Sequence, residues 1–405
     1  MFDTGNTGFM LVATSLVMLM TPGLAFFYGG LVGRKNVLTI MIQSFVSMGV
    51  TTIIWWAYGY SLCFSGGEGA IIGNLDKAFM IGVTLNTPSP FGSGNIPEYV
   101  FMAYQMMFAI ITPALITGAF SNRVRFGSYL MFLVFWLTLV YFPFVHMVWG
   151  NGLLAKLGVL DFAGGIVVHN IAGMAALASV LYVGRRRVGD SVPHSIPLVA
   201  LGTGLLWFGW YGFNAGSELK VDAVTGVAFL NTDIAASFAG PTWMLLAWIF
   251  EKKPKFLGLL TGAVAGLATI TPCAGYVTPT SAVVIGILAG AVCYFAVNLK
   301  NRMRWDDALD VWGVHGVGGA LGIVLLGILA STAVNPAGAD GLLRGNAGFF
   351  AKQLLTVVVS SVYAFLFTYI MLWVINKITR VRTSEGEEER GLDDSLHGES
   401  AYQGV

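Results

Sequence analysis

Two histidines lie inside long apolar segments of this 405-residue chain, His169 in DFAGGIVVHN and His315 in DVWGVHGVGG. Ionisable groups are expensive to bury in an apolar medium, so a pair in matching segments indicates a function. A neutral imidazole carries one donor and one acceptor, which lets two facing rings bond to each other and still contact a small ligand. Such a pair could also pass a proton. The alternative for each histidine is a hydrogen-bonded residue of the core.

Each histidine segment opens with an aspartate, Asp161 in the first and Asp310 in the second. An aspartate at the start of a helix can accept hydrogen bonds from free backbone N–H groups. It can also attract a cation, and the pattern leaves both roles open. A further carboxylate, Asp233, lies inside another apolar segment, where it could face a subunit contact or an aqueous cavity.

Aromatic and hydroxyl side chains gather in three other segments, HMVWGNG, MAYQMMF and WFGWYGFNAGS. Tryptophan and tyrosine near the ends of membrane spans are typical of an interfacial belt. Phenylalanine is not typical of such a belt, and aromatic faces can also hold a cation. The pattern favours neither interpretation. The residues concerned are Tyr104, Phe108, Trp149, Trp207, Trp210, Phe213 and Ser217.

Composition excludes several other kinds of protein. The net charge of +1 leaves no large basic surface for a nucleic acid. The three cysteines show no metal-ligand spacing, so we expect no metal site and no disulfide framework. No P-loop, HExxH or GxSxG motif is present, so we expect neither an enzyme nor a cofactor.

The elements that position these residues are predicted to be membrane-spanning helices. Hydrophobic residues make up 56% of the chain and charged residues only 11%, too few to cover a soluble globule of this size. Apolar stretches long enough to span a bilayer recur about eleven times. They lie near 8–32, 38–64, 99–120, 126–148, 162–184, 196–215, 224–250, 257–275, 280–299, 308–331 and 348–377. Glycine triplets such as Gly258, Gly262 and Gly266 predict close helix packing.

The basic residues predict the orientation of the chain. Of the 22 lysines and arginines, 17 fall in every second loop or the C-terminal tail, and 5 fall in the other loops. The positive-inside rule makes the first set cytoplasmic. The N-terminus is then outside and the C-terminus inside, which requires an odd number of crossings. We therefore expect an all-α, multi-pass protein of the cytoplasmic membrane.

The two histidine segments are five spans apart, so they run in opposite directions. His169 lies eight residues from the start of its segment, about 12 Å deep at 1.5 Å per residue. His315 comes to a similar depth from the opposite face. This geometry predicts two inverted five-helix repeats with a site near the midplane. The expected transmembrane domain is 1–378, with repeats at about 8–184 and 196–331, a final helix at 348–377, and a polar tail at 379–405. Composition alone favours a disordered tail over a cytoplasmic control element.

With these residues in place, the chain resembles a prokaryotic ammonium transporter of the Amt family, within the Amt/Mep/Rh superfamily. The resemblance covers nearly the whole length. It rests on TPGLAFFYGGLVGRKN, HMVWGNGLLAKLGVLDFAGGIVVH, PHSIPLVALGTGLLWFGWYGFNAGS, GAVAGLATITPCAGYV, WDDALDVWGVHGVGG and the tail GLDDSLHGESAY. It implies a homotrimer of eleven-span protomers, each with its own pore, and a regulatory tail. It also implies a cytosolic PII signalling protein as a partner.

The resemblance implies a role for each candidate residue. Trp149 and Ser217 would recruit ammonium on the outer side, with Tyr104 where many relatives carry a phenylalanine. Its hydroxyl could add a hydrogen bond to the cation. Phe108 and Phe213 would form a gate, and His169 and His315 would line the pore beneath it. Asp161, Asp310 and Trp210 would support the site.

Two further departures from the family pattern are Asn151, where a glycine is usual, and Asp233, at a position that is usually uncharged. We expect the cation to lose its proton near the gate and ammonia to cross an apolar pore, with the proton passing along the histidines. The main alternative is a membrane ammonium sensor with little flux. No kinase or cyclase domain follows residue 405, which favours transport. A conduit for another neutral gas, as in the Rh branch, would not require Trp149 and Ser217.

Overall fold

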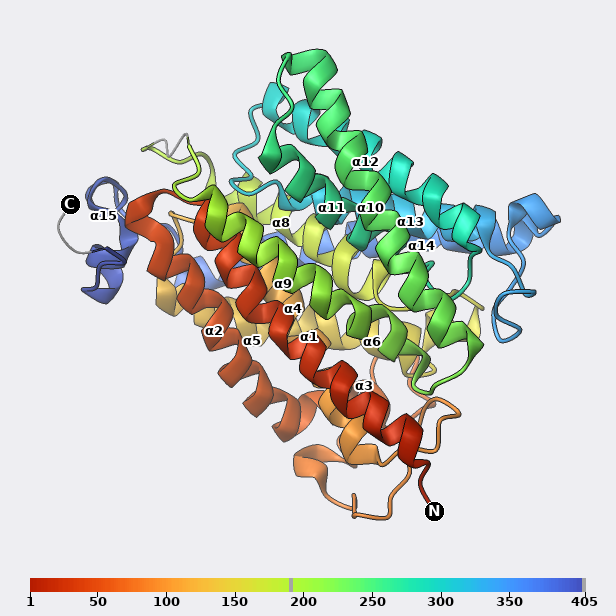
Figure 1. Ribbon diagram of the computed structural model, residues 1–405. Helices are drawn as coiled ribbons and strands as arrows, with labels where there is room; N and C mark the ends of the chain where they lie inside the picture. The colour runs from red at the N-terminus through yellow and green to blue at the C-terminus, as the bar shows by residue number, and fades with distance from the viewer. Residues whose placement is uncertain (189–191, 403–405) are drawn as a thin grey trace.

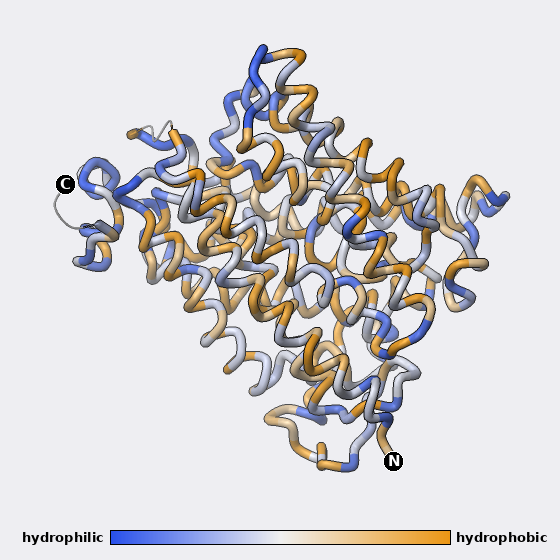
Figure 2. The backbone as a smooth tube through the Cα atoms, viewed as in Figure 1, coloured by the Kyte–Doolittle hydropathy of each residue, from blue (hydrophilic) through white to orange (hydrophobic). Residues whose placement is uncertain are grey.

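The computed structural model describes residues 1–188 and 192–402, and within them the fold is a bundle of long, tilted helices (Figure 1). Apart from two isolated β-bridges, these residues contain no β-structure. The N-terminus and the C-terminal tail lie at opposite ends of the bundle (Figure 1). Hydrophobic residues follow one another along most of the helices, and the hydrophilic segments gather toward the ends of the bundle (Figure 2).

The first half of the described chain contains the helices given in the next sentence, and two of them continue through a π-helical turn into the helix that follows. They are α1 (Thr4–Leu31), α2 (Val37–Ile54) running through Trp55–Gly59 into α3 (Tyr60–Phe64), α4 (Glu98–Phe120), α5 (Phe126–Trp136) running through Leu137–Tyr141 into α6 (Phe142–Trp149), α7 (Leu153–Lys156), and the π-helical η5 (Gly165–Asn170) running into α8 (Ile171–Val183).

The helices after residue 192 repeat part of this pattern. They are α9 (Ile196–Ala215) ending in the 3₁₀ turn η6 (Gly216–Glu218), α10 (Ala223–Glu251), α11 (Phe256–Ile270), α12 (Pro279–Arg302), the π-helical η7 (Trp312–Gly316) running into α13 (Val317–Leu329), α14 (Ala347–Ile378), α15 (Glu385–Arg390) and η9 (Asp393–His397). Short 3₁₀ turns lie at Arg34–Asn36, Ala78–Met80 and Leu342–Arg344.

Ten helical segments of the described chain are long and apolar enough to cross a membrane. The predicted span at 257–275 differs, because its helix ends at Ile270 after 15 residues. At 1.5 Å per residue it covers about 22 Å, less than a hydrocarbon core of about 30 Å. The following turns keep their carbonyls paired, since the buried Asn231 amide donates to Ala274 O at 2.9 Å and Val277 O at 2.8 Å. Non-helical backbone at this depth needs such partners. The chain is thus a multi-pass membrane protein, and the count of eleven crossings stays a prediction.

Glycines bring α11 against α10, as the triplet spacing predicts. A Cβ at Gly262 would lie 2.6 Å from Trp243 Cβ, and one at Gly266 would lie 2.5 Å from Ala235 O. Helix α10 also packs on α12, and α1 packs along α9. These pairs place α1, α4, α9 and α11 around the two histidine segments.

The two histidine segments come into contact through glycines, with Gly173 of α8 lying against Gly316 of η7. A Cβ at Gly173, in α8, would lie only 2.1 Å from the Gly316 Cα in η7. One at Gly319, in α13, would lie 2.9 Å from His169 Cβ. The backbones therefore touch directly, and this contact fixes the distance between His169 and His315.

We predict that Gly173→Ala destabilises the bundle by about 3 kcal/mol or more, since neither backbone can yield to the added methyl group. Thermal unfolding of the purified protein in detergent should show a lower midpoint than wild type. Gly204→Ala is the matched control, because a Cβ there meets no atom within 4 Å. Equal midpoints for the two variants would contradict the close crossing.

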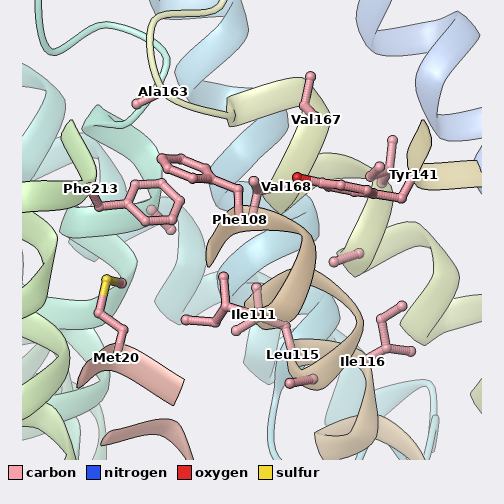
Figure 3. Close-up of a cluster of buried hydrophobic side chains, with 14 of the residues drawn as sticks. Met20, Phe108, Ile111, Leu115, Ile116, Tyr141, Ala163, Val167, Val168 and Phe213 are labelled. Carbon is pink, nitrogen blue, oxygen red and sulfur yellow. The ribbon is translucent and has the colours of Figure 1, made fainter. Parts of the chain in front are cut away.

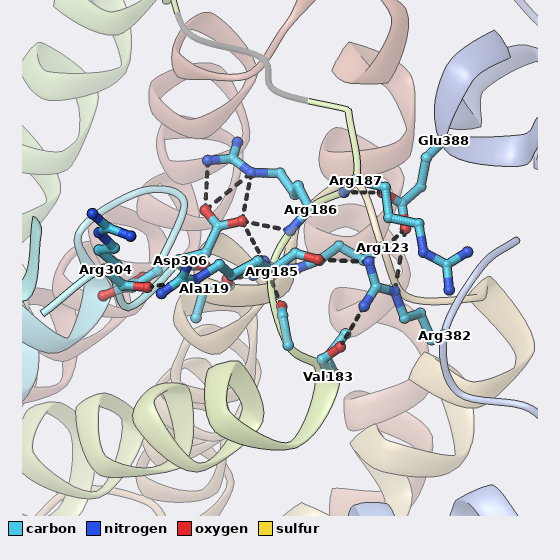
Figure 4. Close-up of polar contacts among 12 residues, drawn as sticks. Ala119, Arg123, Val183, Arg185, Arg186, Arg187, Arg304, Asp306, Arg382 and Glu388 are labelled. Atoms are coloured by element: carbon cyan, nitrogen blue, oxygen red, sulfur yellow. Dashed lines mark hydrogen bonds and ion pairs between the residues drawn. The ribbon is translucent and has the colours of Figure 1, made fainter. Parts of the chain in front are cut away.

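The tail is folded through residue 402, so the expectation of disorder is wrong for its described part. The Asp393 carboxylate accepts hydrogen bonds from Leu38 N at 3.0 Å and Thr39 N at 2.7 Å, capping α2. The Arg382 guanidinium donates to Val183 O at 3.0 Å and also contacts Glu388, which accepts from Arg187 N at 2.8 Å (Figure 4).

A capping box starts α15. Hydrogen bonds from Ser384 and the charge of Arg125 hold the pKa of Glu387 below its ordinary value. The tail is thereby joined to the loop between α4 and α5, as well as to the start of α2 and the end of α8.

Candidate functional site

Two phenylalanine rings form the centre of the site. Phe108 from α4 and Phe213 from α9 lie with ring centroids 4.2 Å apart at an angle of 32°. Both are 1% exposed, and the two rings lie against each other, with Ile111 and Met20 close by (Figure 3). Trp149 stands on edge to Phe108, at 5.8 Å and 89°. The structure therefore brings the two phenylalanines and Trp149 together.

A cavity of about 270 Å³ lies on the Trp149 side of these rings. The Trp149 indole N–H donates to Asp161 O at 2.9 Å, which fixes the ring in the cavity wall. The lining also includes Gln105, Phe162, Ser217, Glu218 and Tyr276. Aromatic faces, a hydroxyl and a carboxylate are groups that stabilise a small cation.

Tyr104 does not line this cavity as a cation ligand, which corrects the expectation for its hydroxyl. The side chain is completely buried, and its O–H lies 2.8 Å from Phe213 O and 2.9 Å from Gly212 O. It also lies 3.2 Å from the hydroxyl of Ser217, which donates to Phe213 O at 2.8 Å. Its one proton is directed to the main chain, so Tyr104 holds the end of α9 in position behind Phe213 and Ser217.

The two histidines lie on the other side of the phenylalanines. Their Nδ1 atoms are 3.2 Å apart, so one ring can donate its proton to the other. The rings stack at 5.2 Å and 20°, and the His169 ring lies 6.1 Å from Phe213. Trp210 stacks on His169 at 5.4 Å and is itself held by its N–H donating to Thr271 Oγ1 at 2.9 Å.

The space beside the histidines is small and apolar. It has a volume of about 10 Å³, roughly what one water molecule requires. Nine apolar side chains line it together with Trp210 and the two imidazoles: Met20, Leu24, Phe27, Ile111, Leu115, Val168, Leu206, Phe213 and Val264. The His169 Nε2 is buried and has no hydrogen-bond partner among the described residues. A hydrated ion does not fit here, whereas a small neutral molecule does.

A second cavity, of about 150 Å³, extends from His315 to the segment between α8 and α9. Its wall includes Tyr28, Arg186, Asp310 and Val314. The order of parts is thus the cavity at Trp149, an aromatic pair, a histidine-lined constriction and this second cavity; we call the two cavities outer and inner after the predicted orientation.

Asp161 holds the start of the first histidine segment. Its Oδ1 accepts from Gly164 N at 2.8 Å and Gly165 N at 2.7 Å, and its Oδ2 accepts from Ile166 N at 2.7 Å and Val167 N at 3.2 Å. The side chain is 5% exposed. Because all four bonds are to the main chain, the geometry supports capping rather than direct contact with a cation.

Asp307, and not Asp310, has the matching place in the second segment. Asp307 accepts from Val311 N at 3.1 Å and Trp312 N at 2.7 Å, and it precedes His315 by the same eight residues that separate Asp161 from His169. Burial raises the pKa of Asp307 to about 6, against the pull of the Lys300 charge. Asp310 instead has a φ of 61° and pairs with Lys300 at 2.5 Å, so it cannot cap this helix.

An ion-pair network around Asp306 joins the segments that follow α4, α8 and α12 (Figure 4). The completely buried Arg123 donates to Asp306 at 2.8 Å, and Arg186 donates to it at 2.7 Å. Burial alone would raise the pKa of Asp306, but the hydrogen bonds and charges of these two arginines hold it below its ordinary value.

Sequence reasoning missed Glu218 and Gln105 in the outer cavity and Asp307 behind His315. The spacing of eight residues could have identified Asp307. Glu218 adjoins the predicted Ser217, but no periodicity marks which side of the turn it faces. Asp233 bonds to the Tyr211 hydroxyl at 2.6 Å, away from the cavities described above. No cluster of three metal-ligating side chains occurs among the described residues.

Comparison with known proteins identifies the family of the chain. The sequence profile of the Ammonium Transporter Family matches residues 8–402. An ammonium transporter of Bacillus subtilis (strain 168) is 47% identical over 401 residues, covering 98% of each chain. The crystal structure of Mep2 from Candida albicans superposes with a TM-score of 0.89 at 37% identity, over 95% of this chain and 88% of that one. A structure titled "Sensor Amt Protein" superposes with a TM-score of 0.88 at 30% identity, over 97% and 98% of the two chains. The chain belongs to the ammonium transporter family.

Proposed function

We propose that this protein takes up ammonium through the constriction between Phe213 and His315 and conducts it as neutral ammonia. The observation that carries the proposal is the passage itself: two stacked phenylalanines above two bonded imidazoles, in a space of about 10 Å³ between two larger cavities. Trp149 and Ser217 hold the cation in the outer cavity. The proton leaves near the phenylalanine pair, and ammonia passes along the histidines.

Desolvation decides which species crosses. Taking an unpaired ion into an apolar lumen costs several kcal/mol even after relaxation. Neutral ammonia avoids that charge penalty, and the bonded imidazole pair leaves one Nε2–H that can donate to its lone pair and one Nε2 that can accept from its N–H groups. The constriction therefore favours ammonia over any bare cation.

Potassium is excluded by chemistry and not by radius alone. Ammonium carries N–H donors that a hydroxyl and aromatic faces can accept, and it can give up a proton. Potassium can do neither, so it reaches the phenylalanine pair with its full charge. The pore therefore selects ammonium over potassium at the point where ammonium loses its proton.

The proton also passes along the imidazoles, but by transfer from one ring nitrogen to the next and not together with the ammonia molecule. The distance of 3.2 Å between the Nδ1 atoms supports transfer from one ring to the other. Transport would then move one positive charge per ammonium, which makes it electrogenic.

The wider arrangement is proposed on the same basis. The shared spacing from Asp161 to His169 and from Asp307 to His315 supports two inverted five-helix repeats. We propose a homotrimer in the cytoplasmic membrane, with eleven crossings, the N-terminus outside and the tail inside. The tail, docked on the start of α2 and the end of α8, supports a regulatory role and a cytosolic PII protein as its partner.

A rapid ammonium jump applied to liposomes that contain the protein tests this function. We expect an inward current that saturates with ammonium, is absent from empty liposomes and is not produced by potassium. The likeness to a sensor favours one other candidate, a receptor that binds ammonium with little flux. Saturable ammonium binding without current would support the receptor and contradict transport.

A further inference from the structure

Glu218 is a carboxylate in the wall of the outer cavity that the proposed pathway does not yet use. It follows Ser217 directly at the end of η6, and both residues line the cavity with Trp149, Phe162 and Tyr276. Its side chain is only 12% exposed. A carboxylate that is largely removed from water interacts strongly with a cation brought beside it, because solvent screens the charges less.

The turn that carries Glu218 is held on several sides. Leu219 has a φ of 61°, and its N–H donates to Gly216 O at 2.9 Å. The carbonyl of Lys220 accepts from Thr225 Oγ1 at 2.7 Å, and Asp222 starts α10 with a capping box. From the first helix, Asn6 Oδ1 accepts from Val221 N at 2.8 Å. The position of Glu218 is therefore fixed by the backbone.

Lys220 neutralises this carboxylate only in part. Its ammonium group lies 2.9 Å from Asp222 and 3.5 Å from Glu218. One positive charge is thus shared between two negative ones, with the closer contact to Asp222. The hydrogen bond that Lys220 donates to Asp222 is the main reason that the pKa of Lys220 is raised, so this charge stays in place.

The negative charge also acts inside the cavity. Burial raises the pKa of Tyr276, and the charges of Glu218 and then Asp161 raise it further. Tyr276 belongs to the same wall, so the field of Glu218 reaches the space where a cation would be held.

We propose that Glu218 is a substrate-binding residue that draws ammonium into the outer cavity and holds it against Ser217 and the aromatic rings. The inference rests on the proposed transport function and adds to it the charge that raises ammonium concentration at the entrance. Lys220 opposes this effect, because it competes with ammonium for the same carboxylate.

The two residues should therefore change apparent affinity in opposite directions. In liposomes at low ionic strength, we expect Glu218→Gln to raise the apparent KM of the ammonium current about three- to tenfold, with the saturating current unchanged. We expect Lys220→Gln to lower the apparent KM about two- to fivefold. Added inert salt should reduce both differences.

Glu68→Gln is the matched control, since it removes a carboxylate from an exposed outer loop that does not line the cavity. Its apparent KM should equal that of wild type. Equal KM values for wild type and Glu218→Gln would overturn the proposal, as would a loss of saturating current in Glu218→Gln. A change of the same sign in the Glu218 and Lys220 variants would make the ion pair merely structural and would also overturn it. Absence of current in the wild-type protein would instead contradict transport.

Discussion

Replacing both pore histidines with leucine is expected to reduce the ammonium-dependent current about a hundredfold, the scale of a lost acid–base group. Leucine is close to histidine in volume, so His169→Leu with His315→Leu keeps the constriction filled and apolar. It removes the two ring nitrogens that lie 3.2 Å apart. The measurement is the current after an ammonium jump in liposomes, recorded beside the pH change inside them.

The same variant separates the proton route from the ammonia route. Ammonia entry, read as alkalinisation of the interior, should persist while the current is lost. Potassium should still be excluded, because no space for a hydrated ion has been opened. His397→Gln, which removes an imidazole from the tail, serves as the control and should keep the wild-type current. An unchanged current in the leucine variant would remove the histidines from proton transfer.

Asp161→Ala is expected to abolish transport and to destabilise the protein by more than about 3 kcal/mol. Four backbone N–H groups donate to this carboxylate, and alanine leaves all of them buried without an acceptor. The start of η5 would then shift, moving His169 and releasing the carbonyl that holds Trp149. The measurements are the unfolding midpoint in detergent and the ammonium current in liposomes.

Asp307→Ala provides the matched comparison on the other histidine segment. Asp307 accepts only two backbone N–H groups, so its loss should lower the unfolding midpoint less than that of Asp161. Asp161→Asn should retain part of the stability, since one amide oxygen can still accept. A wild-type unfolding midpoint together with a wild-type current in Asp161→Ala would show that these four hydrogen bonds are dispensable.

The sequence was most informative where a chemical rule constrains a residue strongly. Histidines inside apolar segments and a two-sided distribution of basic residues pointed to a membrane protein with a polar pair at depth. The resemblance supplied Phe108 and Phe213 as a pair, and their rings do lie together. The histidines are informative because burying an ionisable group in a membrane is expensive. Phenylalanine has no such cost there, so only the resemblance distinguished this pair from other apolar residues.

The sequence was least informative where backbone geometry decides the outcome. Asp310 looked like the partner of Asp161, but a φ of 61° and the nearby Lys300 give that place to Asp307. The helix from Phe256 stops at Ile270 because Asn231, distant in sequence, satisfies the turn that follows. The Tyr104 hydroxyl donates to main-chain carbonyls of α9, and no local sequence pattern identifies these acceptors. Such contacts depend on the tertiary structure and produce no periodic pattern in the sequence.

The docked tail has a consequence for biogenesis. The acceptor for the first free amides of α2 is Asp393, more than 350 residues later in the chain. A ribosome that has released most of the bundle into the bilayer has not yet made that residue. The end of the bundle that carries the tail is therefore completed only when translation ends, and the last segment to be synthesised secures one of the first to be inserted.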